Sequence, residues 1–170
     1  MVVVIMGVSG SGKTTIGQRL ADTLRWEFVD ADSFHSPSNR KKMSAGSPLS
    51  EQDRRPWLEA LREAIDRWIN EGRNVVLACS ALTASARRIL ISNSRSVKLV
   101  YLKGPFDLIQ ARLTRRPRHF MPQGLLASQL DTLEEPADAL TIDAGKAPDA
   151  ITAHIVASLD LTILLDPPHL

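Results

Sequence analysis

The chain has 170 residues, of which 44% are hydrophobic and 24% are charged, a balance that is ordinary for one globular domain with its own core. Its formal net charge of +2 is too small to indicate a nucleic-acid-binding protein, and the N-terminal apolar run is too short to span a membrane. The single cysteine excludes an intramolecular disulfide. We therefore expect a cytoplasmic protein with one domain over residues 1–170 and with neither nucleic acid nor membrane as a partner.

Short apolar runs alternate along the chain with amphipathic segments of helical length. We expect strands at residues 2–6, 27–30, 74–79, 97–102 and 139–143, and helices at residues 13–25, 37–45, 56–70, 84–92, 106–114, 124–132 and 148–159. The helix that starts at Pro56 is expected to have Asp53 just before it and Gly72 just past its end. Strands separated by helices predict a parallel sheet covered on both faces, in which ligands bind beyond the carboxyl ends of the strands.

The first strand leads into Gly7-Val8-Ser9-Gly10-Ser11-Gly12-Lys13-Thr14, which matches the phosphate-binding pattern G-x-x-x-x-G-K-[ST]. In such a P-loop, glycines let several backbone N–H groups face one anion, and the N-terminus of the following helix adds partial positive charge. We expect Lys13 to reach the β- and γ-phosphates of a nucleoside triphosphate, Thr14 to ligate Mg²⁺, and Thr15 to belong to the same nucleotide site. The alternative is a glycine-rich turn that fits the pattern by chance, which the strand before it and the helix after it disfavour.

Two aspartates, Asp30 and Asp32, follow the second predicted strand. Asp30 is a candidate Mg²⁺ ligand, because hard cations prefer carboxylate oxygen, and Asp32 is a candidate base for the hydroxyl that attacks the γ-phosphate. The alternative is a turn, in which aspartate is favoured for its local hydrogen bonds. P-loop proteins usually add an acidic residue from another strand, but the runs at 74–79 and 97–102 contain none. Asp30 is therefore the best remaining carboxylate for the metal.

Further motifs follow in a distinctive order along the chain. They are Asp30-x-Asp32-x-Phe34-His35, Pro37, Asn39, Lys42-Met43, Gly46, Pro48-Leu49, Asp53-Arg54, Pro56-Trp57-Leu58, Cys79-Ser80-Ala81-Leu82, Tyr101-Leu102-Lys103-Gly104, Arg112-Leu113, Arg116, His119-Phe120 and Ser128-Gln129-Leu130. This series resembles the gluconokinases, which are P-loop kinases that phosphorylate D-gluconate at its 6-hydroxyl. The resemblance extends from residue 2 to about residue 155.

The resemblance implies an α/β fold of the three-layer αβα P-loop NTPase type. It is similar to the nucleoside monophosphate kinases, with a parallel sheet, a substrate-binding helical segment at about 34–58 and a lid at about 113–123. ATP and Mg²⁺ are the implied cofactors, a small sugar acid is the implied substrate, and a homodimer in the cytosol is the implied assembly.

A gluconate carboxylate needs a basic partner, and arginine can grip it with two parallel hydrogen bonds. Arg54 is the first candidate, followed by Lys42 and His35. For Arg54 the alternative is a surface charge near a helix start, and for His35 it is a turn histidine bonded to the backbone. Trp57 shares a helical face with apolar residues and is expected in the core rather than against the sugar.

The arginine-rich segment at 112–118 suits phosphoryl transfer, because guanidinium groups stabilise charge that develops on phosphate oxygens. The resemblance assigns Arg112 to the nucleotide, His119 to the substrate, and Arg116 to both substrate binding and catalysis together with Lys13 and Asp32. A basic surface loop or a nucleic-acid-binding patch is the alternative.

Three positions depart from the pattern of the gluconokinases. Thr83 stands where a lysine is usual, Ala86 where a tyrosine is frequent, and Arg118 where a glycine is usual. The departures leave the identity of the sugar acid open. A shikimate-type kinase, a kinase of another sugar acid, and a nucleotide-binding regulator without catalysis remain as alternatives.

Overall fold

A computed structural model describes residues 1–91, 95–115 and 123–161. These residues form a five-stranded sheet in the order β2-β3-β1-β4-β5, and every neighbouring pair is parallel. The strands are β1 (Val2–Met6), β2 (Glu27–Asp30), β3 (Val75–Ala78), β4 (Val97–Lys103) and β5 (Leu140–Asp143). The parallel sheet confirms the predicted α/β class.

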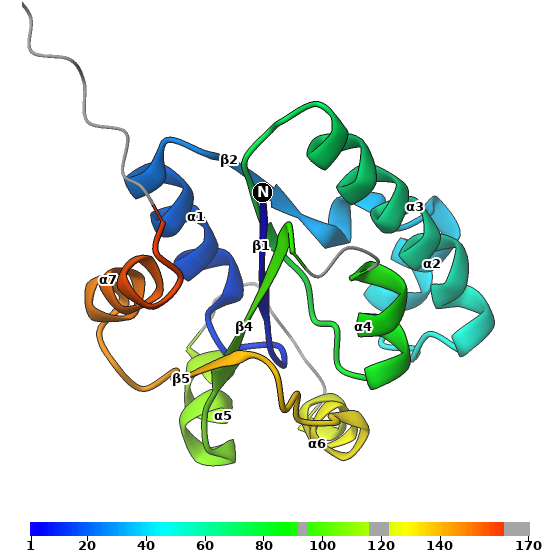
Figure 1. Cartoon of the computed structure of the whole chain (residues 1–170). Helices are drawn as coiled ribbons and strands as arrows, with labels where there is room; N and C mark the ends of the chain where they lie inside the picture. The colour runs from blue at the N-terminus through cyan, green and yellow to red at the C-terminus, as the bar shows by residue number, and fades with distance from the viewer. Residues whose placement is uncertain (92–94, 116–122, 162–170) are drawn as a thin grey trace, which may run out of the picture.

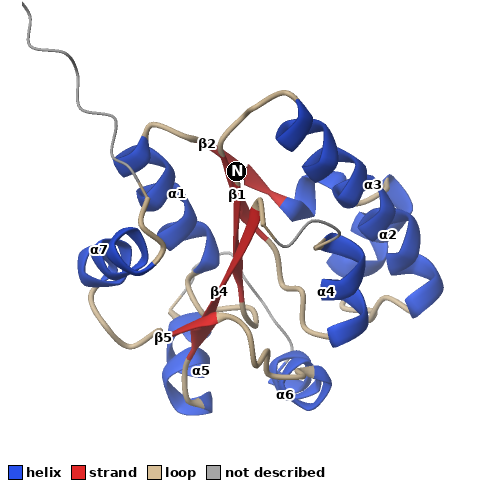
Figure 2. Cartoon of the chain, viewed as in Figure 1, coloured by secondary structure: helices blue, strands red, loops and turns tan. Residues whose placement is uncertain are grey.

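Helices cover both faces of this sheet (Figures 1 and 2). They are α1 (Lys13–Leu24), α2 (Pro37–Ser44), α3 (Glu51–Asn70), α4 (Ala84–Leu90), α5 (Phe106–Thr114), α6 (Gln123–Thr132) and α7 (Pro148–Ser158). Helices α1 and α7 lie side by side on one face, and α3 and α4 lie on the other. None of the helices in the described ranges is long and apolar enough to cross a membrane.

The central strand β1 is buried on both sides, as its continuous apolar run predicts. Because successive side chains of a strand point to opposite faces, Val2, Val4 and Met6 join the core under α3 and α4. Val3 and Ile5 join the core under α1 and α7. The carboxyl end of β1 is thereby fixed in the middle of the sheet, where the P-loop begins.

The start of α3 corrects one prediction. The helix begins at Glu51, five residues before Pro56, and Ser50 is its N-cap. The Ser50 hydroxyl accepts a hydrogen bond from the backbone N–H of Asp53, and the Asp53 carboxylate accepts one from the backbone N–H of Ser50. This capping box satisfies N–H groups that a helix start leaves unpaired. It starts the helix upstream of Pro56, so Asp53 lies inside the first turn rather than before it.

The other helix and strand ends lie within two residues of the predicted ones. A short 3₁₀ helix, η1 (Ala31–Phe34), follows β2 and was not predicted. The predicted Gly72 terminator is confirmed, since Gly72 follows the last turn of α3 with φ +68°.

Candidate active site

The P-loop connects the carboxyl end of β1 to α1 and depends on glycine at two tight positions. Gly7 has φ +148° and Gly10 has φ +84°, conformations that side chains disfavour. A Cβ atom on Gly7 would lie 2.7 Å from Ser11 Oγ, and one on Gly10 would lie 2.8 Å from Leu113 Cγ. The loop therefore packs closely against α5 while its backbone curves around the N-terminus of α1.

The start of α1 is suited to an anion. No side chain caps the helix, and its first turn contains no acidic residue, so its first N–H groups and partial positive charge face outward. Lys13 Nζ donates a hydrogen bond to the carbonyl of Val8 at 3.1 Å across the loop. Arg112 reaches the same loop from α5, because its Nη1 donates to the carbonyl of Ser11 at 3.4 Å and its Nη2 to that of Ala144 at 2.7 Å. The chemistry of these groups fits a triphosphate.

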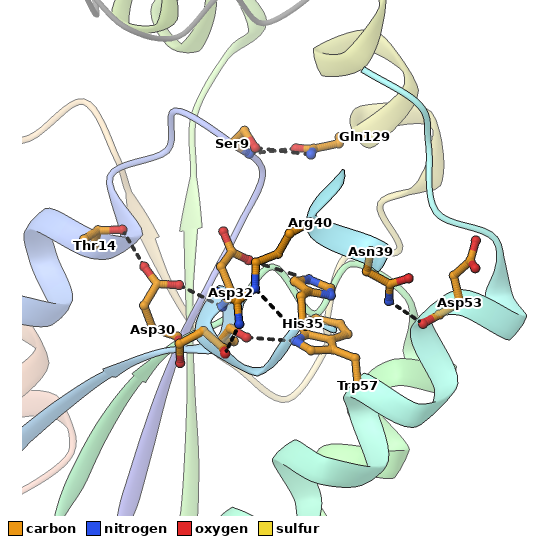
Figure 3. A network of polar contacts seen from close by, with 12 residues as sticks. Ser9, Thr14, Asp30, Asp32, His35, Asn39, Arg40, Asp53, Trp57 and Gln129 are labelled. Atoms are coloured by element: carbon orange, nitrogen blue, oxygen red, sulfur yellow. Dashed lines mark hydrogen bonds and ion pairs between the residues drawn. The ribbon is translucent and has the colours of Figure 1, made fainter. Parts of the chain in front are cut away.

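Thr14 and Asp30 meet at the carboxyl ends of the strands. Thr14 Oγ1 donates to Asp30 Oδ2 at 3.3 Å, and Asp30 Oδ1 accepts from the backbone N–H of Asp32 at 3.0 Å as the N-cap of η1 (Figure 3). A hydroxyl and a carboxylate side by side form a donor set that fits Mg²⁺, which prefers oxygen ligands and keeps several waters.

Asp32 lies on η1 with its carboxylate 74% exposed, so a substrate hydroxyl can reach it. Its neighbour His35 is only 5% exposed, and His35 Nε2 lies 3.9 Å from Asp32 Oδ1. The imidazole stacks on Trp57 with ring centroids 4.4 Å apart and an interplanar angle of 11°. Burial lowers the pKa of His35, the Asp32 carboxylate opposes that shift, and Arg40 adds to it. Burial therefore favours the neutral imidazole of His35, which lies behind Asp32.

The turn that carries Asp32 is held by side chains of the next two helices. Trp57 Nε1 of α3 donates to the carbonyl of Ala31 at 2.8 Å. From α2, Arg40 Nε donates to the carbonyl of His35 at 2.9 Å. Trp57 is 6% exposed, which confirms its expected place in the core and adds a second task, the support of His35.

The basic candidates for a carboxylate lie on α2 and α3. Lys42 Nζ of α2 is paired with Asp53 Oδ1 of α3 at 2.7 Å. Asn39 Nδ2 donates to the backbone carbonyl of Asp53 at 2.7 Å, which joins the same two helices. Arg54 follows Asp53 directly and is half-buried, and it forms no ion pair with a carboxylate of the described residues. Within the described residues, Lys42 is thus paired with a carboxylate of the protein, whereas Arg54 is not.

Comparison with known proteins decides the family. The chain is 42% identical to a probable gluconokinase of Xenopus tropicalis over an alignment of 183 positions, which covers 97% of this chain and 96% of that protein. The chain belongs to the gluconokinase family. The broader family model of shikimate kinase matches residues 9–160, in keeping with a shared kinase architecture.

Solved structures agree with membership in the gluconokinase family. A sugar kinase from a Janibacter species is 42% identical, with a TM-score of 0.87 over 94% of both chains. A gluconokinase from Sinorhizobium meliloti is 37% identical, with a TM-score of 0.83 over 93% of this chain and 90% of that one. The P-loop kinase fold that the resemblance implied is confirmed.

The lid of a gluconokinase was expected at about 113–123. Its flanking helices α5 and α6 are described, but Arg116, Arg118 and His119 lie outside the described residues. Thr83, one of the departures from the family pattern, is the N-cap of α4 and accepts a hydrogen bond from the backbone N–H of Ala86 at 3.2 Å.

Two residues near the loops were given no role from the sequence. Arg87 of α4 is 9% exposed, and its Nη1 donates to the carbonyls of Ala81 and Leu82, both at 3.0 Å. It shapes the loop after β3. Gln129 of α6 contacts Ser9 in the P-loop. Gln129 falls within a motif shared with the gluconokinases, Ser128-Gln129-Leu130. Its polar side chain in a leucine-rich helical segment was the sequence signal that could have indicated a functional contact.

Proposed function

We propose that this member of the gluconokinase family transfers the γ-phosphoryl group of ATP to the 6-hydroxyl of D-gluconate, which yields 6-phospho-D-gluconate and ADP. The observation that carries the proposal is the exposed Asp32 carboxylate, which lies two residues after Asp30, the contact of Thr14 in the P-loop, and is followed by the α2–α3 segment that bears Arg54. Similarity to gluconokinases over nearly the whole chain supports gluconate as the acceptor. The protein is a kinase whose acceptor is an alcohol group.

The nucleotide half of the proposed site consists of the P-loop amides, Lys13, Thr15 and Arg112. Thr14 and Asp30 are the proposed holders of Mg²⁺, and their adjacency at 3.3 Å supports that role. Bound Mg²⁺ would neutralise part of the phosphate charge. The task of the protein groups is to position the triphosphate and to stabilise its charge, which is most of what phosphoryl transfer needs.

The acceptor half is centred on Asp32. In the proposed reaction, the Asp32 carboxylate accepts the proton of the 6-hydroxyl while the hydroxyl oxygen bonds to the γ-phosphorus and the bond to the leaving ADP oxygen breaks. Arg54 is the proposed grip on the gluconate carboxylate. Lys42 and His35 are further proposed substrate-binding residues, and the geometry supports indirect action for both, Lys42 through Asp53 and His35 behind Asp32.

Arg116 and His119 complete the proposed site from the lid, with Arg116 acting on the transferred phosphoryl group. We further propose that the protein works in the cytoplasm as a homodimer, an assembly that the likeness to gluconokinases favours.

A coupled assay for ADP release tests the function. The purified protein is supplied with ATP, Mg²⁺ and one acceptor at a time: D-gluconate, shikimate, other sugar acids and nucleoside monophosphates. Selective turnover of gluconate supports the proposal. Selective turnover of shikimate would replace it with the shikimate-type alternative, and tight ATP binding without any acceptor would indicate a regulator.

A further inference from the structure

Gln129 lies on the face of α6 that packs against the P-loop. Leu126 of this helix belongs to one apolar cluster with Val8 of the loop, and Leu130 of α6 and Leu133, just past its end, pack against that cluster. Residues three apart share a helix face, so Gln129 lies on the same face as Leu126, which packs on the loop. An amide in such a place costs free energy unless it is hydrogen-bonded, and the partner of Gln129 therefore explains its presence.

That partner is Ser9, which lies 120 positions away in the sequence. The backbone N–H of Ser9 donates to Gln129 Oε1 at 2.7 Å, and Gln129 Nε2 donates to Ser9 Oγ at 3.2 Å (Figure 3). The directions of these two hydrogen bonds follow from the chemistry of the groups. A backbone N–H can only donate, so the amide oxygen faces it and the amide nitrogen faces the hydroxyl, whose oxygen must accept.

The direction of these hydrogen bonds orients the Ser9 hydroxyl. Because its oxygen accepts from Gln129, its proton points away from Gln129 and toward a third group. Its backbone N–H is also taken by Gln129, so Ser9 offers its side chain rather than its backbone to an anion. Ser9 lies in the loop between Val8, which is buried, and Gly10, whose φ of +84° curves the backbone.

We propose that Gln129 is a positioning residue that holds the Ser9 hydroxyl as a hydrogen-bond donor to the terminal phosphate of the bound nucleotide. The inference rests on the proposed function in taking that nucleotide as the phosphoryl donor. A donor that is aligned before the reaction stabilises developing charge without reorganisation. Gln129 acts only through Ser9 and touches neither substrate.

The test compares Gln129→Met, which keeps the size of the side chain and removes both hydrogen bonds, with Ser9→Ala and the double variant. Each single variant is expected to lower kcat and the affinity for ATP by about tenfold. The double variant is expected to have no lower kcat or ATP affinity than the more impaired of the two single variants, because both substitutions remove the same donor. KM for gluconate should not change. Ser128→Ala, on the exposed side of α6, is the matched control and should stay close to the wild type.

Multiplied losses in the double variant would overturn the proposal, because the two residues would then act independently. Wild-type kcat in Gln129→Met, or a fall in Tm with unchanged kinetics, would also overturn it. Gln129→Glu is the second variant: its carboxylate still accepts from the Ser9 N–H but forces the hydroxyl to donate to it. We expect a near-normal Tm with reduced kcat, and normal kcat at saturating ATP would refute the proposal.

Equilibrium titration of ATP into these variants separates this inference from the proposed function. If the wild type phosphorylated no sugar acid, the function would fail, whereas equal losses of ATP affinity in Ser9→Ala and Gln129→Met, without a further loss in the double variant, would still support the pairing.

Discussion

The two aspartates that follow β2 are held in different ways. Both oxygens of Asp30 are engaged, one by the Thr14 hydroxyl and one by the backbone N–H of Asp32. The carboxylate of Asp32 is largely exposed, with His35 and Trp57 stacked behind it. Two adjacent carboxylates therefore have separate surroundings, which suits a metal-holding role for one and proton acceptance for the other.

Replacement of Asp32 tests the proposed base. Asp32→Asn should lower kcat by about a hundredfold or more, because an amide cannot accept the hydroxyl proton, and it should leave the affinity for ATP close to that of the wild type. Steady-state kinetics with gluconate and equilibrium binding of ATP give the two quantities. Asp22→Asn, an exposed position on α1, is the control. Near-normal turnover in Asp32→Asn would exclude Asp32 as the base.

Replacement of Asp30 tests the proposed metal role. Asp30→Asn keeps an oxygen that can cap η1 but loses the negative charge that favours Mg²⁺. The Mg²⁺ concentration needed for half-maximal activity should rise by about an order of magnitude, as a titration of Mg²⁺ at fixed ATP would measure. The same Mg²⁺ dependence in variant and wild type would contradict the assignment.

At the scale of elements, the start of α3 organises the substrate-binding segment. Ser50 and Asp53 cap the helix reciprocally, and Asp53 also binds Lys42 of α2. One carboxylate thus starts one helix and ties it to its neighbour. Arg54 follows directly on α3, so its position depends on this junction.

The junction should make stability depend on pH. Hydrogen bonds from Lys42 and Ser50 lower the pKa of Asp53 from 3.8 to about 2. The folded protein therefore prefers ionised Asp53 more strongly than the unfolded chain does, and the stability that this adds is present above pH 3.8 and is lost as the pH falls toward 2. In thermal unfolding, the wild type should lose more Tm over this range than Asp53→Asn does. Parallel pH profiles would contradict the expectation.

The cap itself has a separate contribution. Ser50→Ala removes the side-chain acceptor of the first turn and should lower the free energy of unfolding by about 1 kcal/mol, as measured by urea denaturation. Ser158→Ala, at the exposed last residue of α7, is a control that should have little effect. Equal stability of Ser50→Ala and the wild type would argue against the capping role.

At the scale of the whole molecule, the strand order sets where the functional groups meet. β1 lies between β3 and β4, so the P-loop emerges at the centre of the sheet. α5 and α6 then pack on it through Val8, Ile109, Leu113 and Leu126. The P-loop is thus supported by α5, which precedes the proposed lid in the sequence, and by α6, which follows it.

Gly10→Ala tests this packing. The added Cβ would meet Leu113 Cγ at 2.8 Å, and overpacking of this kind should cost about 1–3 kcal/mol of stability and weaken ATP binding more than tenfold by displacing the loop. Gly72→Ala is the matched control, because Gly72 also has a positive φ but nothing lies within 4 Å of the added atom. It should lose some stability to backbone strain and bind ATP normally. Equal ATP affinity in both variants would contradict a role for the close packing.

The fold was largely predictable, because buried strands and amphipathic helices are repeated local patterns. The exception at Pro56 is instructive. Because a proline is favoured in the first turn of a helix, Pro56 indicated that the helix begins there. Ser50 and Asp53, upstream of Pro56, form the stronger signal for the start. The turn η1 was missed because it is stabilised by the Asp30 cap and by Trp57 from α3, and the second of these contacts is not local.

By itself, the sequence determined the P-loop, the acidic pair and the gluconokinase family, because each depends on residue types in a continuous order. Only the tertiary structure decided which groups meet: Thr14 with Asp30, His35 on Trp57, and Ser9 with Gln129. The physical reason is that hydrogen bonds and ring contacts reach only a few ångströms. Their partners therefore depend on strand order and on the orientation of packed helices, which no local pattern encodes.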